Sequence, residues 1–281
     1  MLDDFHKKVS NGATSVHFGE VELYILSKHM DMERFTPGDG IFFMAKSIPY
    51  ISGYKDIADR LKVKDLLEIG IYKGGSVVFF DNTFDLDRLT AIDISQDRLP
   101  HLDGYVEKYG KSKKINLHYG VDQGDRSTLN ALIDRDFPDG LDLVIDDASH
   151  FYGPTKATFE TVFPRLRPGG VYVVEDWSWA HSNPSDGGDN EDATRLLHEI
   201  IALHASSGGM ARSIDLRPGF FSVTRGITPI PANFRLEDYA LKHRVGAIQD
   251  ATASEAPGTA QQSHTPIGRL KRLARTLLGR S

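Results

Sequence analysis

Two acidic clusters end apolar runs in the middle of the chain. The run LDLVIDDASH contains Asp146, Asp147 and His150, and the run VYVVEDW ends on Glu175 and Asp176. If both runs are parallel strands, their carboxyl ends meet at one edge of a sheet, so these side chains are expected to gather there. Four carboxylates at one edge repel one another unless a cation neutralises them. Oxygen ligands favour a hard cation, Mg²⁺ before Ca²⁺ or Mn²⁺.

The same residues have a simpler interpretation that the sequence leaves open. Asp146 or Asp147 would cap the following helix, and the Glu-Asp pair would be a solvated strand end. Two acidic pairs with a histidine three residues past the first favour a metal site beside a general base. Zinc is disfavoured, because the chain has no cysteine and a single nearby histidine. Trp177 and Trp179 follow the second pair, where they would stack on a ligand or wall the site.

A glycine-containing loop, LLEIGIYKGGS, follows the first predicted strand of the sheet. Its Gly70 and Gly75 allow a tight turn and close approach of a ligand. The loop departs from the dinucleotide pattern G-x-G-x-x-G, because Tyr72 stands where the second glycine should be, and this disfavours NAD or FAD. Glu68, two residues before the first glycine, suits a ligand with a cationic amino-acid end.

Polar residues follow the next two predicted strands. Asp93 lies about 25 residues after Glu68, where a carboxylate can accept both hydroxyls of a ribose. Gln123 and Asp125 are able to read the edge of an adenine. Each of these residues could instead be a solvated loop residue or a helix N-cap.

These motifs resemble class I S-adenosylmethionine-dependent methyltransferases over roughly residues 66–226. The E-x-G-x-x-x-G-G-S form is similar to the sugar O-methyltransferases of macrolide biosynthesis, of the macrocin and mycinamicin type, with the cephalosporin hydroxylase-like family as a relative. The resemblance implies that S-adenosylmethionine and Mg²⁺ are the cofactors. It implies that Asp147, Glu175 and Asp176 bind the metal, that His150 is the base and that Asp146 faces the methionine end of the cofactor. The full predicted cofactor set is Glu68, Gly70, Tyr72, Gly75, Ser76, Asp93, Gln123, Asp125 and Asp146.

The predicted activity is Mg²⁺-dependent methylation of a sugar hydroxyl on a natural product, glycolipid or polysaccharide. A sugar hydroxyl is a poor nucleophile at neutral pH, so a cation and a neutral histidine beside it meet a chemical need. Two neighbouring hydroxyls of the acceptor are expected to chelate the ion. Three alternatives remain: a catechol-type phenol methyltransferase, which favours an Asp-Asn pair, a NAD-dependent oxidoreductase, and a non-catalytic cofactor-binding protein.

The pattern around these motifs predicts an α/β fold, a doubly wound, seven-stranded, mostly parallel sheet ending in an antiparallel hairpin. Short apolar runs alternate with amphipathic stretches from about residue 51. The expected parallel strands are Asp65–Ile69, Leu89–Ile92, Ile115–Tyr119, Leu141–Ile145 and Val171–Glu175. The expected helices are Ser76–Phe84, Asp97–Tyr109, Arg126–Ile133, Tyr152–Phe163 and Glu191–Ala205. The expected hairpin strands are Ser213–Leu216 and Phe220–Thr224.

Both ends of the chain lie outside this pattern. Residues 1–50 are predicted to be an irregular lid or substrate segment, with a short helix over Val21–Met30 and a turn over Phe35–Gly40. Core packing is favoured over a lid role for its aromatic residues and for Tyr54. The methyltransferase domain is expected over residues 51–248, a low-complexity linker over 249–266, and a basic amphipathic helix over 267–281.

Composition narrows the classes of protein further. The 281 residues carry a net charge of −6, which argues against a general nucleic-acid binder. No signal peptide or run of 18 apolar residues is present, so a cytoplasmic protein without a transmembrane segment is expected. The basic tail helix could touch an anionic membrane surface, a partner, or a second copy of the chain in a homo-oligomer. The expected acceptor is a sugar-containing molecule.

Overall fold

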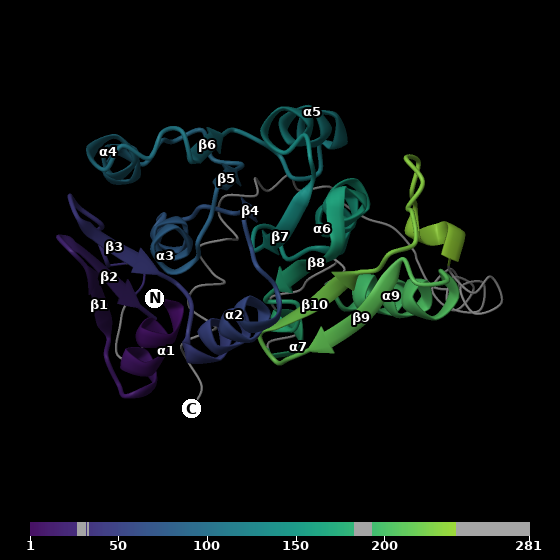
Figure 1. Ribbon diagram of the computed structural model, residues 1–281, viewed down its shortest axis with the longest axis horizontal. Coiled ribbons are helices and arrows are strands. Elements are labelled where there is room, and N and C mark those ends of the chain that lie inside the picture. Colours follow the sequence, from purple (N-terminus) through teal and green to yellow (C-terminus); the bar gives the residue numbers. More distant parts are fainter. Residues whose placement is uncertain (27–31, 33, 183–192, 240–281) are drawn as a thin grey trace, which may run out of the picture.

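A seven-stranded sheet forms the centre of the molecule, in the order β6-β5-β4-β7-β8-β10-β9 (Figure 1). This computed structural model describes residues 1–26, 32, 34–182 and 193–239. β6, β5, β4, β7 and β8 are parallel neighbours, and β10 pairs antiparallel with both β8 and β9. The strands are β4 (Asp65–Ile69), β5 (Arg88–Asp93), β6 (Ile115–Tyr119), β7 (Leu141–Asp146), β8 (Leu166–Glu175), β9 (Ala211–Leu216) and β10 (Phe220–Arg225).

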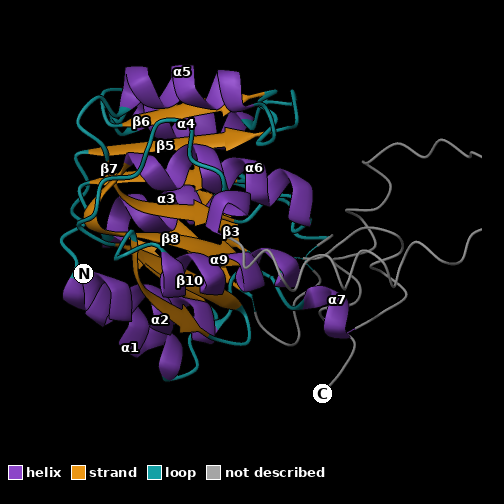
Figure 2. Ribbon diagram, turned by 90° about the vertical axis from the view of Figure 1, so that its right-hand side faces the viewer, coloured by secondary structure: helices purple, strands orange, loops and turns teal. Residues whose placement is uncertain are grey.

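Helices cover both faces of this sheet, as the alternating pattern predicts. Figure 2 shows the strands stacked from β6 near the top to β10 near the bottom, with helices packed around them. One face is covered by α2 (Ile48–Arg60), α3 (Gly75–Thr83) and α4 (Pro100–Lys108). The other face is covered by α5 (Arg126–Asp136), α6 (Tyr152–Val162) and α9 (Thr194–Ser206).

Alternation along the strands divides the core into two layers. Successive strand residues point to opposite faces, so Leu66 and Leu143 pack with α3 while Leu67 and Val144 pack with α5 and α6. All four side chains are fully buried. Burying a leucine or valine contributes about 1.5–3 kcal/mol relative to leaving it exposed. The two layers hold the strands rigidly, so the loops at the carboxyl edge have a fixed base.

The N-terminal residues are more regular than the sequence predicts. They form α1 (Leu2–Ser10) and a second sheet of β1 (Ser15–Phe18), β2 (Val21–Ile25) and β3 (Ile41–Met44). The helix expected from Val21 is therefore wrong over its described part. Its residues alternate between buried and half-buried, which is the period of a strand. The rest of that stretch up to Met30 extends beyond the described residues.

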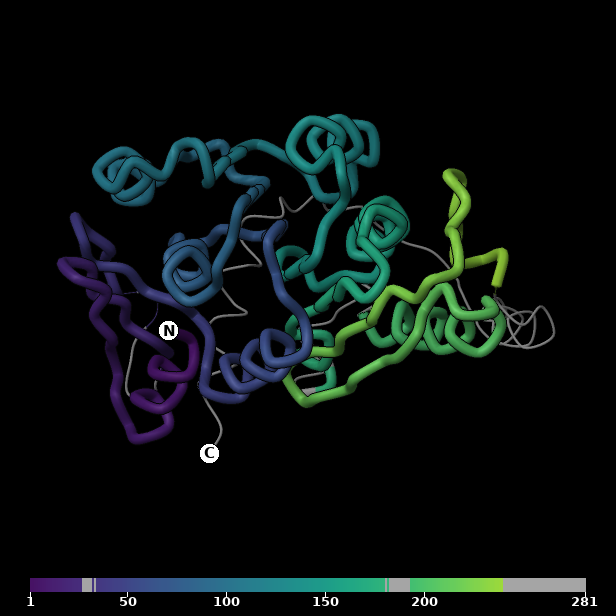
Figure 3. The backbone as a smooth tube through the Cα atoms, in the orientation of Figure 1, coloured from purple at the N-terminus to yellow at the C-terminus, as the bar shows by residue number. Residues whose placement is uncertain are grey.

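This N-terminal sheet is part of the same core as the large sheet. β3 and α1 lie beside α3 and α2 (Figure 3), and the ring of Phe5 meets that of Phe79 edge-on, with centroids 5.0 Å apart. A Cβ at Gly75 would lie 2.1 Å from the Phe43 carbonyl oxygen, so only glycine allows β3 to come this close to α3. Phe42 and Phe43 are buried, which confirms their packing role.

The remaining boundaries agree closely with the sequence. The seven-stranded fold and its antiparallel hairpin are confirmed, and β8 begins five residues earlier than expected, at Leu166. Three short elements complete the description: the helix α7 (Trp179–Ser182) and the 3₁₀ turns η1 (Phe163–Arg165) and η2 (Leu236–Tyr239). The predicted linker and tail helix lie outside the described residues. Among those described, no helix has the length and apolar character to cross a membrane.

Candidate active site

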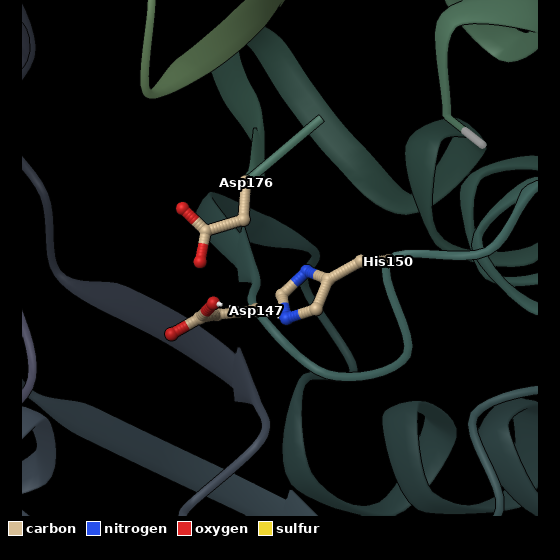
Figure 4. A group of neighbouring side chains, drawn as sticks. All are labelled: Asp147, His150 and Asp176. Atoms are coloured by element: carbon tan, nitrogen blue, oxygen red, sulfur yellow. Dashed lines mark ion pairs between the residues drawn. The ribbon is translucent and has the colours of Figure 1, made fainter. Parts of the chain in front are cut away.

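Three side chains with metal-ligating atoms meet at the carboxyl ends of β7 and β8. One ligand atom from each of Asp147, His150 and Asp176 lies within 4.8 Å of the others (Figure 4). His150 Nε2 lies 3.9 Å from Asp147 Oδ1. In Figure 4 the imidazole ring and the two carboxylates surround a common space. All three side chains are partly buried and so are accessible from solvent, whereas the neighbouring Lys46 and Glu175 are buried.

The backbone holds these side chains in conformations that few residues adopt. The Asp147 amide donates to the Ile69 carbonyl, 2.9 Å away, which ties the end of β7 to the end of β4. The Asp176 amide donates to the Gly219 carbonyl at 2.7 Å. His150 and Asp176 have φ angles of 57° and 51°, in the left-handed region. Such residues cost about 1–3 kcal/mol each and cluster at functional sites.

A buried lysine bridges two of the predicted metal ligands. Lys46 Nζ donates to Asp147 Oδ2 at 2.7 Å and to Glu175 Oε2 at 2.6 Å. The Lys46 and Glu175 side chains are 3% and 2% exposed. Burial opposes the charge of Lys46, but the charges of Asp147 and Glu175 outweigh it and raise its pKa well above the usual range. The lysine is therefore charged at any physiological pH.

Two tyrosines of α2 donate to the acidic pair of β8. The Tyr50 hydroxyl donates to Asp176 Oδ1, and the Tyr54 hydroxyl donates to Glu175 Oε1. A Cβ at Gly219 would lie 2.6 Å from the Tyr50 ring, so this turn residue gives Tyr50 room beside Asp176. Burial raises the pKa of both tyrosines, which keeps them protonated as donors.

Glu68 is buried without a hydrogen bond. Its side chain is 0% exposed, and neither carboxylate oxygen has a partner among the described residues. Burial raises its pKa to about 7, although the charge of Lys46 and the nearby Ser76 hydroxyl act in the opposite direction. A buried polar group without a partner costs stability, and in a native structure it indicates a site for an ion or ligand, or a functional role.

Asp146 and Gln123 lie together behind the accessible group. Gln123 Nε2 donates to Asp146 Oδ1 at 3.2 Å, and the buried Tyr172 hydroxyl donates to Asp146 Oδ2 at 2.7 Å. Gln123 Oε1 accepts from the Ser149 amide at 2.9 Å, which fixes the loop that leads to His150. Burial raises the pKa of Asp146 to about 7.

The glycine loop is held by Asp93. Asp93 Oδ2 accepts from the amides of Ile71 and Tyr72, at 2.9 and 3.1 Å. Tyr72 has a φ of 50° and is 51% exposed. A Cβ at Gly70 would lie 2.2 Å from the Asp147 carbonyl oxygen. Gly70 therefore lets the loop approach the strand that carries the acidic group, and Ser76 is buried in the first turn of α3.

Asp125 and Trp179 have the simpler structural roles that the sequence analysis left open for them. Asp125 is the N-cap of α5 and accepts from the Ser127 and Thr128 amides. Trp179 is buried and its indole N–H donates to the His150 carbonyl at 3.3 Å, so it walls the site. The Trp177 indole N–H donates to the Arg217 carbonyl at 2.9 Å.

The sequence analysis did not identify Lys46 as a site residue. For Tyr50 and Tyr54 it favoured core packing over a lid role and did not predict their contacts to the acidic pair. Lys46, Tyr50 and Tyr54 are spaced four residues apart around the start of α2. Residues with this spacing lie on one side of a helix, so the spacing is the sequence signal that could have identified them. The strand-end rule does not find them, because they come from the N-terminal segment and not from the carboxyl edge of the sheet.

The sheet order is that of a doubly wound, Rossmann-like α/β fold, with the candidate site at the carboxyl edge of the strands. Residues 67–177 match the model of a methyltransferase domain family, described as "Methyltransferase domain". This part of the chain is therefore similar to a methyltransferase domain.

The curated relatives are O-methyltransferases from actinomycetes. Demethylmacrocin O-methyltransferase of Streptomyces fradiae is 32% identical over 133 residues, which is 45% of this chain and 30% of that protein. A rhamnosyl tetracenomycin-C 2'-O-methyltransferase of Streptomyces olivaceus is 45% identical over 123 residues, 43% of this chain and 29% of that protein. Mycinamicin VI 2''-O-methyltransferase of Micromonospora griseorubida is 34% identical over 130 residues, 44% of this chain and 29% of that protein. The matches thus span less than a third of the length of each relative.

A similar solved structure is the MycE methyltransferase of the mycinamycin biosynthetic pathway in complex with Mg and SAH. It is 25% identical to this chain, with a TM-score of 0.49, over 65% of this chain and 52% of that protein.

Proposed function

We propose that this chain is a Mg²⁺-dependent O-methyltransferase that transfers the methyl group of S-adenosylmethionine to a sugar hydroxyl. The observation that carries the proposal is the accessible group of Asp147, His150 and Asp176 beside the unpartnered carboxylate of Glu68. The relatives support the acceptor class, because their names describe methylation of macrolide and rhamnosyl tetracenomycin compounds.

The donor atoms of the group fit a hard divalent cation. Asp147 and Asp176 offer carboxylate oxygens within 4.8 Å of each other, and a nitrogen of His150 lies within 4.8 Å of both and is kept for the proposed base role. Glu175 stays a predicted third ligand, since a carboxylate has about four acceptor sites and its hydrogen bonds use two. Mg²⁺, when bound, would supply positive charge that lowers the cost of removing a proton from the acceptor.

The cofactor pocket is proposed at the glycine loop. S-adenosylmethionine carries an ammonium group, and Glu68 is a buried carboxylate without a partner that this charge would satisfy. Asp146 is proposed at the same methionine end, and Asp93 at the ribose. Gly70, Tyr72, Gly75, Ser76, Gln123 and Asp125 complete the proposed cofactor set.

His150 is proposed as the base. Its Nε2 faces the carboxylates across the accessible space, and the Trp179 contact at its carbonyl fixes the loop. His150 Nε2 would accept the proton of the acceptor hydroxyl while that oxygen takes the methyl group. Histidine is the side chain that most often acts as a general base in enzymes.

The proposal is tested by methyl transfer from labelled S-adenosylmethionine to a panel of glycosides and catechols, with Mg²⁺ or with EDTA. Turnover of a glycoside that EDTA abolishes and Mg²⁺ restores is the expected result. The panel includes the acceptor lacking the neighbouring hydroxyl, whose kcat/KM is expected to fall at least about tenfold. Preference for catechols would assign the phenol class. Cofactor binding without transfer to any acceptor would assign a binding protein.

A further inference from the structure

A row of hydrogen-bond donors on the N-terminal segment faces the acidic residues of the site. Lys46, Tyr50 and Tyr54 recur at every fourth residue, and the two tyrosines lie one turn apart on α2. We call these three residues the donor row. All three side chains point toward the ends of β7 and β8, where the acidic residues are their partners.

Each contact of the donor row occupies a particular carboxylate oxygen. Lys46 takes Oδ2 of Asp147 and Oε2 of Glu175. Tyr54 takes Oε1 of Glu175, and Tyr50 takes Oδ1 of Asp176. Asp147 is thereby left with Oδ1 toward His150, and Asp176 is left with Oδ2. An ion that used both oxygens of either aspartate would therefore share one of them with the donor row.

The formal charges of the site also match those of one divalent cation. Asp147, Glu175 and Asp176 carry three negative charges when ionised, and Lys46 carries one positive charge inside the cluster. The net charge of −2 matches one divalent cation. Because Lys46 is 3% exposed, water screens its charge weakly, so this charge acts strongly on an ion bound to the same carboxylates.

We propose that the donor row selects the cation of the site, with Lys46 as the main positioning residue. The inference rests on the proposed function and names a determinant of its metal site. Mg²⁺ demands an octahedron of single oxygens, whereas Ca²⁺ takes six to eight oxygens and commonly uses both oxygens of a carboxylate. Donors that occupy one oxygen of each aspartate therefore favour Mg²⁺. The Lys46 charge also keeps the affinity for any divalent cation moderate.

The test measures binding of Mg²⁺ and of Ca²⁺ to the full chain in the presence of S-adenosylhomocysteine. Trp177 and Trp179 are the only tryptophans in the chain, so their fluorescence reports the site directly. Lys46→Met removes the charge and keeps the length of the side chain. It is expected to bind both ions more tightly, with the Ca²⁺-to-Mg²⁺ affinity ratio raised at least about tenfold. Tyr50→Phe removes one hydroxyl and should raise the ratio about threefold.

Lys156→Met is the matched control. Lys156 is also largely buried and also bridges two carboxylates, with Nζ 3.0 Å from Glu199 and 3.1 Å from Glu237. Its loss should lower stability and leave the ion ratio unchanged. An unchanged ratio in a folded Lys46→Met protein would overturn the inference while the proposed function stands. If Lys46→Met does not fold, an unchanged ratio in Tyr50→Phe overturns it. A wild-type chain that binds neither ion refutes the metal site itself, and the inference with it.

Discussion

At the scale of single residues, His150 and Glu68 differ in how far the sequence could predict them. His150 was found by its position three residues after Asp147, and the structure places the two side chains together. The burial of Glu68 and its lack of a partner are visible only in the folded chain, because they depend on neighbours from distant segments. Sequence spacing thus predicts which residues share an edge, but not which of their atoms remain available.

Replacing His150 by alanine should lower kcat by about 10²–10⁴-fold, because a positioned base is lost. The dissociation constant for S-adenosylhomocysteine should change by less than about twofold, because the proposed cofactor contacts remain. His17→Ala is the control, since His17 is 65% exposed and lies in β1. A His150→Ala enzyme that keeps most of its kcat would show that another group takes the proton.

Cofactor affinity should depend on pH through Glu68. Its pKa in the free protein is raised to about 7 by burial, so it is largely protonated at pH 6. An ammonium group beside it favours the ionised form, so binding releases a proton and tightens as pH rises from about 6 to about 8. Calorimetry of S-adenosylhomocysteine binding in buffers of different ionisation enthalpy measures that release. In Glu68→Gln the proton release should shrink, and an unchanged release would place the titrating group elsewhere, with Asp146 the next residue to test.

At the scale of elements, the sequence analysis predicted the parallel strands and the hairpin but no helix at the position of α2. The parallel strands are apolar runs with clear ends, so their positions follow from local pattern. α2 brings Tyr50 and Tyr54 to Asp176 and Glu175, which lie over 120 residues away in sequence. No local pattern contains such a contact. The N-terminal sheet was missed because its three strands follow one another without the intervening helices that mark the large sheet in the sequence.

The turn that ends at Gly219 should control the position of Tyr50. A Cβ there would lie 2.6 Å from the Tyr50 ring, so Gly219→Ala should push Tyr50 away from Asp176. Overpacking of this kind costs about 1–3 kcal/mol, measured as a lower free energy of unfolding. Loss of the Tyr50 contact should also reduce kcat.

Gly153→Ala is the matched control for that substitution. Nothing lies within 4 Å of a Cβ at Gly153, which is in the first turn of α6. The control should be neutral, or more stable by up to about 1 kcal/mol, because alanine loses less backbone freedom on folding. Equal behaviour of the two variants would contradict the steric role assigned to Gly219.

At the scale of the whole molecule, one continuous core joins the N-terminal residues to the large sheet. Residues 1–50 therefore form a structural layer over α3, where the sequence predicted a lid, and a lid role stays a prediction. The boundary expected at residue 51 falls inside α2, which begins at Ile48. Helix and sheet pattern predicted the fold class because alternating strands and helices admit few topologies.

The chain beyond Asp250 is predicted to be dispensable for chemistry. The low-complexity composition of residues 249–266 is typical of a linker, and the structure describes a complete seven-stranded sheet before residue 240. A chain that ends at Asp250 should keep its melting temperature within about 2 °C and its turnover of a soluble acceptor within about twofold. Thermal unfolding and the methyl-transfer assay check both numbers. A large loss of either would mean that the tail packs on the domain or on a second copy.

Tyr72, His150 and Asp176 have left-handed backbone conformations. Substitutions that relieve this strain are expected to stabilise the chain and to lower its activity. Glycine adopts this conformation without strain, so a selection for heat resistance alone should accept glycine most readily at Tyr72, whose ring is 51% exposed. A selection for methyl transfer should reject it there and at the other two positions. A scan of all substitutions under both selections would therefore separate these three positions from the rest of the chain, and in doing so would mark the outline of the active site without a bound ligand.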